Sequence, residues 1–448
     1  MLGRFTPRLI LNACLGLLGL YTTQVFSEPD IKLPQPTQEA RVTDTSSSDK
    51  GAMSDKGATD EENTNNTKDE QIDSWYSDFK VVPFGFVSDS IGNSIGAAGL
   101  LKGAGQPQAA LLGTGFVSDK GSYVSYLGGY NYQLSERWLV DADAYLAQFK
   151  DYNYYLGAAT SNDSEFDDYI ETDGRESRLQ AKFRYVLPLG LGKEKAAQAG
   201  YAPRREITGM TPWDSGVTTL GITPFYKTRK LDDISVDEAE STWGAIFSLD
   251  WDNRDSTRNT TRGSHTIFNY TYAPELGNDE SWSTWEFQNS QYFDIGSLGN
   301  LFNKQVIAFD FYTAGTPSWN QGDNGEHRPP EYAGVRLGGL YRQRGFSSGR
   351  FTGQAAINYS LEYRVMPDWQ PLQHWPVFDW YNVPWWQWVL FTDVGRVADD
   401  YDLSELHDDM QVSYGGAVRF QVEGVVVRAE MAWGDEESLF RVMVNQPF

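Results

Sequence analysis

Short segments in which apolar and polar residues alternate follow one another along most of this chain. In the stretch VVVRAEMAWG, Val425 and Val427 fall on one face, while Arg428 and Glu430 fall on the other. Successive side chains of a β-strand point to opposite faces, so a period of two predicts a strand with one apolar side and one polar side. The stretches INYSLEYRV and FRVMVNQPF repeat the pattern with aromatic residues on the apolar side.

Sixteen such segments lie between clusters of Gly, Asn, Asp and Ser, where turns are expected. An apolar face opposite a polar face, repeated to the end of the chain, is typical of strands that meet lipid outside and line a lumen inside. A soluble β-sandwich also alternates, but its outer face would be polar. We therefore predict an all-β fold, a transmembrane 16-stranded antiparallel β-barrel. Its strands are expected near 79–88, 94–104, 108–118, 121–134, 138–152, 177–189, 217–230, 242–254, 264–274, 282–295, 304–315, 354–365, 386–397, 411–422, 425–434 and 439–448.

The connections between these segments indicate the topology. An even number of strands returns both ends of the barrel to one side of the membrane, which is the periplasm for an exported chain. Two connections on that side are long, 190–216 with several basic residues and 366–385 with many aromatic ones. The first suits a solvated loop or contact with anionic head groups, and the second suits an interfacial girdle. The long loops of the outer face are then 153–176, 231–241, 316–353 and 398–410.

The N-terminal part predicts export. Arg4 and Arg8 precede a dozen mostly apolar residues, which are too few to span a bilayer, so residues 1–27 are expected to be a cleaved signal peptide. Residues 28–74 are rich in Ser, Thr, Asn, Asp and Glu and predict a disordered, acidic periplasmic tail before a barrel of residues 75–448. The single cysteine, Cys14, lies inside the signal, which excludes disulfides from the mature chain.

The charge of the chain limits its partners. A formal net charge of −24 over 448 residues repels polyanions across the surface as a whole. Binding of nucleic acid is therefore not expected.

One stretch, LYRQRGFSSGR at 340–350, places three arginines among glycines. Together with the downstream stretches SLEY and FTDVG, it resembles the Omp85 superfamily, whose members include outer-membrane barrels of the BamA and TamA type and the bacterial surface antigens. Arg344, Gly345 and Phe346 match the tip motif of the family's long loop, and LDWDNRDSTRNTTRG resembles its Asp-Asn-Arg-Asp turn. The resemblance extends over about residues 75 to 448.

The resemblance implies that loop 316–353 folds back into the barrel and that Glu362 and Asp393, on the inner wall, receive Arg344. It also implies that Phe448 is the aromatic end read by the assembly machinery. The chemistry of arginine favours the same pairing, because its guanidinium cannot lose its proton and an unpaired charge in the lumen is costly. The alternative is that Arg344 is a solvated loop residue.

Two features depart from the family's pattern. Gln343 stands where the family usually has an aliphatic residue, which is expected to weaken the packing of the loop. Assembly and two-partner secretion members carry periplasmic POTRA domains before the barrel, whereas residues 28–74 show no pattern of a folded domain. We therefore expect a barrel without POTRA domains, for which a separate periplasmic partner could substitute.

No catalytic residue, metal site or cofactor is predicted. The four histidines have neither the spacing of metal ligands nor a neighbouring nucleophile. Asp141 and Asp143 share a strand face and are expected to line the lumen. The acidic residues of one outer loop suit a solvated loop better than a cation site, namely Asp399, Asp400, Asp402, Asp408 and Asp409.

Two hypotheses for the function follow, both in the bacterial outer membrane. The resemblance implies translocation or insertion of protein or lipid, through a weak seam between the first and last strands. The alternative is a passive diffusion channel or structural barrel without client handling, and an outer-membrane enzyme is a distant third. The partners expected are outer-membrane lipids and, during biogenesis, the assembly machinery.

Overall fold

The computed structural model describes most of the region after the predicted tail. The predicted signal peptide and acidic tail, with Cys14, lie outside it. The described residues are 77–88, 91–232, 239–275, 280–299, 301–322, 327–372, 381–444 and 446–448.

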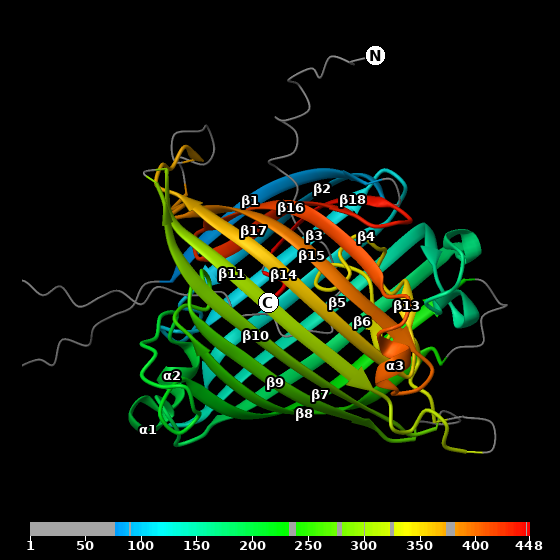
Figure 1. Ribbon diagram of the computed structural model, residues 1–448, viewed down its shortest axis with the longest axis horizontal. Helices are drawn as coiled ribbons and strands as arrows, with labels where there is room; N and C mark the ends of the chain where they lie inside the picture. The colour runs from blue at the N-terminus through cyan, green and yellow to red at the C-terminus, as the bar shows by residue number, and fades with distance from the viewer. Residues whose placement is uncertain are drawn as a thin grey trace, which may run out of the picture.

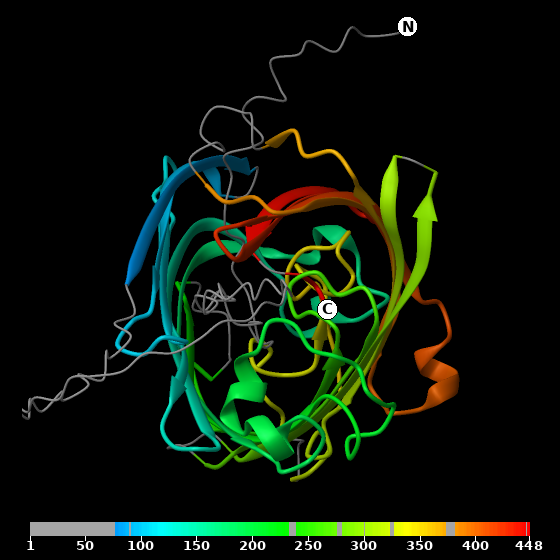
Figure 2. The same cartoon turned by 90° about the vertical axis from the view of Figure 1, so that its left-hand side faces the viewer.

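Sixteen strands form a single antiparallel sheet in which each strand pairs with the next along the chain, so the predicted strand number and fold class are confirmed (Figure 1). Figure 2 looks along the barrel that these strands form. The first eight strands are β1 (Asp78–Ser88), β2 (Gly92–Lys102), β3 (Ala110–Ser118), β4 (Tyr123–Gln133), β5 (Trp138–Tyr154), β6 (Ile170–Val186), β7 (Val217–Leu231) and β8 (Ser241–Arg254). The others are β9 (Gly263–Ala273), β10 (Trp282–Leu298), β11 (Phe302–Gly315), β14 (Ala355–Pro367), β15 (Trp386–Ala398), β16 (Gln411–Val422), β17 (Val425–Trp433) and β18 (Ser438–Val444).

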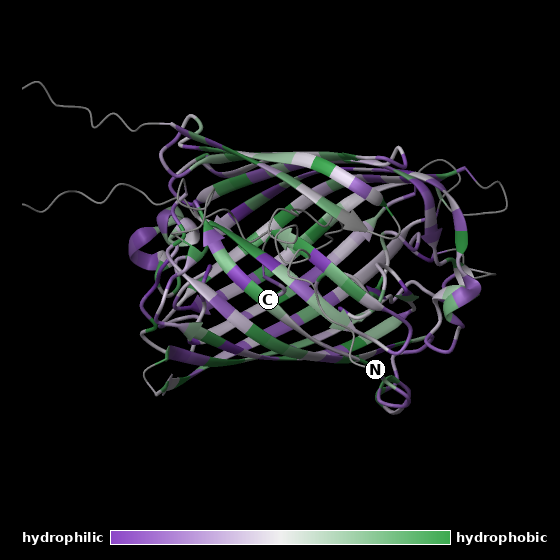
Figure 3. Ribbon diagram, turned by 90° about the horizontal axis from the view of Figure 1, so that it is seen from above, coloured by the Kyte–Doolittle hydropathy of each residue, from purple (hydrophilic) through white to green (hydrophobic). Residues whose placement is uncertain are grey.

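The two faces of the sheet differ as the alternation predicts. Large apolar side chains such as Ile95, Leu127 and Leu390 are exposed on the outside, whereas Glu362 and Arg419 are fully buried. Apolar and hydrophilic residues alternate along the strands in Figure 3. A barrel meets lipid outside and water or its own loops inside, so its apolar side chains face outward and its polar side chains face inward, the reverse of a soluble protein. None of the helices among the described residues is long and apolar enough to span a membrane.

The ends of two strands differ from expectation by four residues or more. β6 begins at Ile170 instead of 177, because it continues past the alternating segment to pair with β5 through Tyr154. β18 ends at Val444 instead of 448, before Pro447, whose nitrogen cannot donate to a neighbouring strand. Phe448 therefore does not extend the apolar face of this strand.

The C-terminal residues turn into the lumen instead (Figure 2). The ring of Phe448 lies 6.4 Å from that of Tyr292, and Arg364 Nη2 donates to its carbonyl oxygen at 3.4 Å. Gln446 donates to the carbonyl oxygen of Arg258. The role of Phe448 as an assembly signal remains a prediction.

The long loop between β11 and β14 folds into the barrel, as predicted (Figure 2). It contains a small sheet of β12 (Arg336–Leu337) and β13 (Phe351–Thr352). Its apolar side chains, Leu337, Phe346 and Phe351 among them, form a buried cluster against residues of β11, β14 and β15. The loop therefore has a core of its own inside a polar lumen.

Short helices occur only in connections within the described part of the chain. We call the end of the barrel where β1 begins the inner rim and the opposite end the outer rim. The 187–216 connection at the inner rim carries α1 (Gly192–Lys195) and α2 (Ala197–Tyr201), which pack on the ends of β5, β6 and β7. The outer rim carries α3 (Leu403–Leu406) and the 3-10 helices η2 (Gly157–Thr160) and η3 (Phe166–Asp168).

β1 and β18 are the two ends of the sheet, and among the described residues no strand pairing joins them. Side chains bridge this seam at the inner rim. Lys102 Nζ lies 3.0 Å from Glu423 Oε2, which joins β2 to the turn between β16 and β17. The hydroxyl of Tyr381 donates to the carbonyl oxygen of Val81 at 3.0 Å.

The Lys102–Glu423 contact predicts a pH dependence. Burial alone would raise the pKa of Glu423, but hydrogen bonds from Asn382 and Lys102 and the lysine charge outweigh it, so the pKa falls below its ordinary value of 4.5. Because the pKa of Glu423 is lower in the folded state than in the unfolded state, its ionised form stabilises the folded state above pH 4.5. This contribution is lost as the pH falls below 4.5. Glu423→Gln should lower the unfolding temperature on semi-native gels by about 1–2 °C at neutral pH.

The difference between wild type and Glu423→Gln should shrink as the pH falls below 4.5 and vanish once Glu423 is protonated in the folded state. A matched Lys102→Met variant should show the same decrease in unfolding temperature at neutral pH. An unfolding temperature that does not change in either variant at neutral pH would mean that this contact does not stabilise the seam.

Candidate functional site: a loop tip held in the barrel lumen

The loop reaches the inner wall through a tight turn. Gly338 and Gly339 have φ values of 93° and 120°, a conformation that favours glycine. Gln343 also adopts a positive φ, of 50°. It does not loosen the loop as expected, because its side chain is fully buried and donates to the carbonyl oxygen of Gln411 on β16 at 3.0 Å.

Arg344 at the tip lies between the two predicted carboxylates. Its Nε and Nη2 donate to the two oxygens of Asp393 at 2.8 and 2.7 Å, and its Nη1 donates to Glu362 Oε1 at 2.6 Å. Its backbone N–H also donates to Asp393, at 3.0 Å. The guanidinium lies 3.6 Å from the ring centre of Phe391. All three charged side chains are fully buried.

The strand register explains why one guanidinium fits both acids. Glu362 on β14 lies opposite Phe391 on β15, and Asp393 lies opposite Ser360. The two acids are therefore diagonal neighbours on one face, about 7–8 Å apart at their backbones, which leaves room for a planar fork between them.

The neighbouring carboxylates keep the Arg344 guanidinium charged. Burial alone would lower the pKa of the Arg344 guanidinium, but the charges of Asp393 and Glu362 outweigh it and raise the pKa. Removal of one partner would leave a buried charge uncompensated, which costs about 3–5 kcal/mol.

Glu362 also receives two wall arginines that the sequence did not connect to the site. Arg419 on β16 donates to its two oxygens at 2.6 and 2.8 Å, and Arg364 Nε donates to Oε2 at 2.8 Å. Alternation had placed Arg364 on the polar face of its strand. A single carboxylate therefore holds the loop tip and two strands together.

The last two strands hold the backbone of the loop. Arg441 on β18 donates to the carbonyl oxygens of Gly339, Arg344 and Phe346, at 3.0, 2.6 and 2.9 Å. Arg428 on β17 donates to the carbonyl oxygen of Leu340. The sequence signal was the placement of both arginines on polar strand faces, but their partners are main-chain atoms that no side-chain motif identifies.

Gly345 is required for space and not for a left-handed turn, since its φ is not positive. A Cβ atom there would lie 2.6 Å from the nitrogen of Gly434 and 2.7 Å from the carbonyl carbon of Trp433. The next residue, Phe346, is fully buried and meets Phe351 edge to face, with ring centres 5.0 Å apart. The tip therefore packs directly on the end of β17.

A second arginine anchors the loop nearer the outer rim. Arg350 donates to both carboxylate oxygens of Glu436, in the turn between β17 and β18, through Nε at 2.8 Å and Nη2 at 2.5 Å. It also donates to the carbonyl oxygens of Ala159 and Ser164, at 2.9 and 2.7 Å. The loop is thus attached to the outer connection between β5 and β6 as well.

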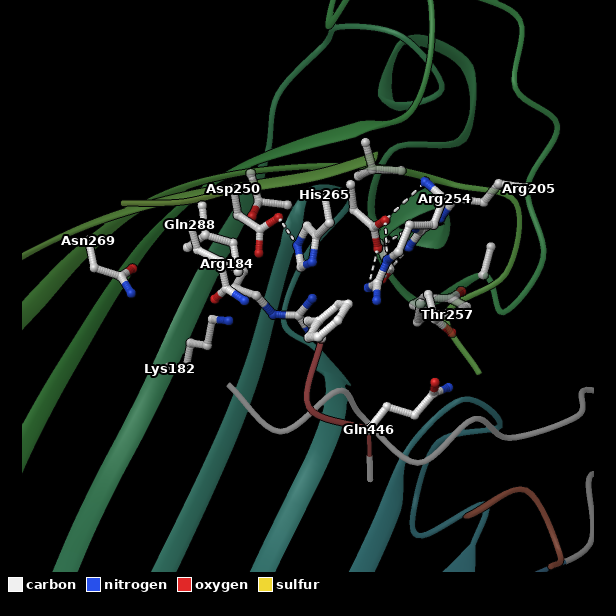
Figure 4. Close-up of a pocket in the computed structure, with 18 of the residues that line it drawn as sticks. Lys182, Arg184, Arg205, Asp250, Arg254, Thr257, His265, Asn269, Gln288 and Gln446 are labelled. Carbon is white, nitrogen blue, oxygen red and sulfur yellow. Dashed lines mark hydrogen bonds and ion pairs between the residues drawn. The ribbon is translucent and has the colours of Figure 1, made fainter. Parts of the chain in front are cut away.

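A polar cavity of about 130 Å³ lies in the lumen toward the inner rim (Figure 4). Its charges are largely paired: His265 lies 2.9 Å from Asp250, and Arg254 donates to both oxygens of Asp252 at 2.8 and 2.9 Å. Arg205 reaches the same Asp252 from the 187–216 connection.

The predicted acids on β5 do line the lumen wall. Asp143 accepts hydrogen bonds from Arg178 at 3.1 Å and Gln180 at 2.9 Å, and Asp141 accepts one from Arg184 at 3.0 Å. No cluster of His, Cys, Asp or Glu suited to a metal ion occurs among the described residues.

The model of the Omp85 superfamily domain matches residues 114–448. The chain belongs to the Omp85 superfamily. Members of this superfamily are bacterial outer-membrane barrels that insert or translocate proteins.

Three solved structures are similar to this chain at low sequence identity. CdiB from Escherichia coli is 11% identical with a TM-score of 0.51, over 83% of this chain and 62% of that one. BamA from Haemophilus ducreyi lacking POTRA domains 1–3 is 13% identical, with a TM-score of 0.48, over 82% and 69%. CdiB from Acinetobacter baumannii is 10% identical, with a TM-score of 0.47, over 81% and 58%. The chain thus spans less than two thirds of either CdiB structure. No curated protein matches the chain.

The packing of Gly345 predicts a steric effect. Gly345→Ala should destabilise the tip by about 1–3 kcal/mol, because backbone atoms on β17 leave no room for a methyl group. The measurement is protease cleavage within the loop of the folded barrel, which should become faster.

Gly416→Ala is the matched control, since a Cβ there meets nothing closer than 3.5 Å. Equal protease resistance in Gly345→Ala and Gly416→Ala would contradict the close contact between the tip and β17.

Proposed function

We propose that this protein takes part in the translocation or insertion of protein or lipid at the outer membrane, with the loop as a releasable plug. The observation that carries the proposal is the fully buried fork of Arg344 on Asp393 and Glu362. It joins the loop tip to the wall through buried ion pairs and hydrogen bonds, next to the apolar packing of Phe346.

A polar latch suits release better than an apolar one. Burying two charges costs nearly as much as their attraction returns, so a buried ion pair specifies a position without adding much net stability. When the tip withdraws, water in the lumen can solvate Arg344 and both carboxylates. The apolar contacts of Leu337 and Phe351 then supply the remaining attachment of the loop.

The latch also lies beside the seam. Gly345 contacts the end of β17, and Arg441 on β18 binds three carbonyl groups of the tip. Movement of the tip would therefore change the contacts of the last two strands. We infer that release of the plug loosens the β18 edge, which would give a client lateral access to the membrane.

The polar cavity supports the second candidate, a diffusion channel in which the loop is a fixed constriction. In this alternative the tip stays in place while solutes diffuse through the lumen. The partners proposed for the first function are outer-membrane lipids, the assembly machinery during biogenesis and a separate periplasmic protein.

The plug is tested with Arg344→Ala in planar bilayers. Loss of about 3 kcal/mol at the tip should raise the fraction of time that it is detached about a hundredfold, and conductance should rise with it. The conductance of Arg344→Lys should lie between those of wild type and Arg344→Ala, because one ammonium group cannot replace the bidentate fork of arginine. Folding is checked by heat-modifiable gel mobility.

Arg254→Ala, which removes a buried lumen arginine paired with Asp252, is the matched control. Conductance in Arg344→Ala no higher than in Arg254→Ala would contradict the plug. To separate the two functions, cells without the protein are compared for outer-membrane protein and lipid content. Normal content with altered solute uptake would favour the channel.

A further inference from the structure

The connection between β6 and β7 crosses the wall of the barrel at the inner rim. Its first half lies on the lumen side, where α2 packs on Leu139 and Arg205 reaches Asp252. Its second half, the 208–215 segment, lies on the opposite side of the wall, against the lipid-facing side of β8. A single connection therefore contacts both faces of the same strand.

Hydrogen bonds attach the 208–215 segment to side chains that point away from the lumen. Trp251 Nε1 donates to the carbonyl oxygen of Ser215 at 3.1 Å, and Asn253 Nδ2 donates to a second main-chain carbonyl oxygen of the segment at 3.1 Å. Both side chains alternate along β8 with residues that line the lumen cavity, such as Asp252. The segment therefore lies outside the barrel wall.

Burial along β8 shows how far this cover extends. Asn253 points away from the lumen at the rim, yet it is only 4% exposed. Leu249, four residues earlier on the same side of the strand, is 47% exposed. The segment thus covers the rim end of β8 and leaves the lipid-facing part of the strand bare.

The segment presents two large apolar side chains to its surroundings. Met210 is 90% exposed and Trp213 is 63% exposed. The turn between them is ordered by hydrogen bonds from the N–H groups of Asp214 and Ser215 to the carbonyl oxygen of Thr211, at 3.1 and 3.0 Å. A single exposed apolar residue needs no explanation, but two on one ordered turn beside a lipid-facing wall indicate a contact surface.

The position of the segment indicates what covers this surface. Trp251 lies two residues, or roughly 7 Å, beyond the lipid-facing Leu249. The interfacial layer of a bilayer is roughly 5–8 Å deep on each side, and tryptophan is enriched there. We propose that the 208–215 segment inserts Met210 and Trp213 into the phospholipid leaflet at the inner rim. The segment thereby continues the lipid-facing surface of the barrel.

Apolar insertion, and not lipid charge, drives this contact. Apart from Arg205, which pairs with Asp252, the connection carries three charges of each sign. They are Lys193, Lys195 and Arg204 against Glu194, Glu206 and Asp214. The contact is therefore expected in zwitterionic and anionic bilayers alike.

The contact goes beyond the plug, because it acts on the cover of the inner mouth. Gly200 and Tyr201 of the same connection line the polar cavity. Lipid on one side of the wall and the ion pair of Arg205 with Asp252 on the other then hold the connection over the rim.

The test measures the depth of a label at position 210. Cys14 is the only cysteine in the sequence, so Met210→Cys combined with Cys14→Ser gives one site for the fluorophore NBD. The barrel is reconstituted in phosphatidylcholine vesicles with or without brominated phosphatidylcholine, which quenches the label only within the bilayer. Most of the fluorescence at 210 should be lost to quenching, and its emission should shift to shorter wavelength. Adding phosphatidylglycerol to the vesicles should not change the result.

Two other labelled positions define the scale. Leu249→Cys on the lipid-facing wall should be quenched as strongly, and Ser161→Cys in an exposed outer connection should be hardly quenched. Should the label at 210 disturb the turn, Trp213→Cys gives a second site on the same turn. Quenching at 210 and 213 no greater than at 161 would overturn the proposal and would leave the surface free for a periplasmic protein.

The outcomes separate this contact from the plug, since the label reports its depth with the loop in place. Quenching at 210 together with unchanged conductance in Arg344→Ala refutes the plug and supports the membrane contact. Raised conductance in Arg344→Ala together with unquenched labels at 210 and 213 supports the plug and refutes the membrane contact.

Discussion

The permanent positive charge of Arg344 determines the arrangement around the loop. Arginine stays protonated at every physiological pH, so Arg344 can be buried only where carboxylates are already in place. The register of β14 and β15 supplies them as diagonal neighbours on the lumen face. Glu362 then draws in Arg364 and Arg419, so the same carboxylate that receives the tip also ties two strands of the wall.

This dependence follows from the inverted polarity of the barrel. A soluble domain gains most of its stability from an apolar interior, but here the exposed outer face is apolar and the lumen is polar. The lumen therefore holds the loop tip mainly with hydrogen bonds and ion pairs, which need exact partners and contribute modestly in net terms, while an apolar cluster holds the rest of the loop.

The strands could be predicted from the sequence because each has to present alternate faces to lipid and lumen. The ends of the strands were harder to predict. β6 continues beyond its alternating segment, and β18 ends before Pro447. The resemblance singled out Arg344, Glu362 and Asp393, and alternation alone placed Glu362 on the polar face. Arg428 and Arg441 could not be connected to the loop, because main-chain carbonyl groups leave no trace in a sequence. The need for Gly345 arises from a contact with β17, about ninety residues away, and not from its own turn.

The contacts of the tip extend from β14 to β18, and this span links the plug to the seam. On one side Arg344 binds side chains of β14 and β15, and on the other Arg441 binds the tip's backbone from β18. A tip that leaves must break both sets, and the strand left with unmet donors is the unpaired edge of the sheet. The side-chain contact of Lys102 with Glu423 then remains as a connection across the inner rim. On the proposed function the outer part of the seam would separate first, because there the loop, through Arg350, links Glu436 beside β18 to the connection between β5 and β6.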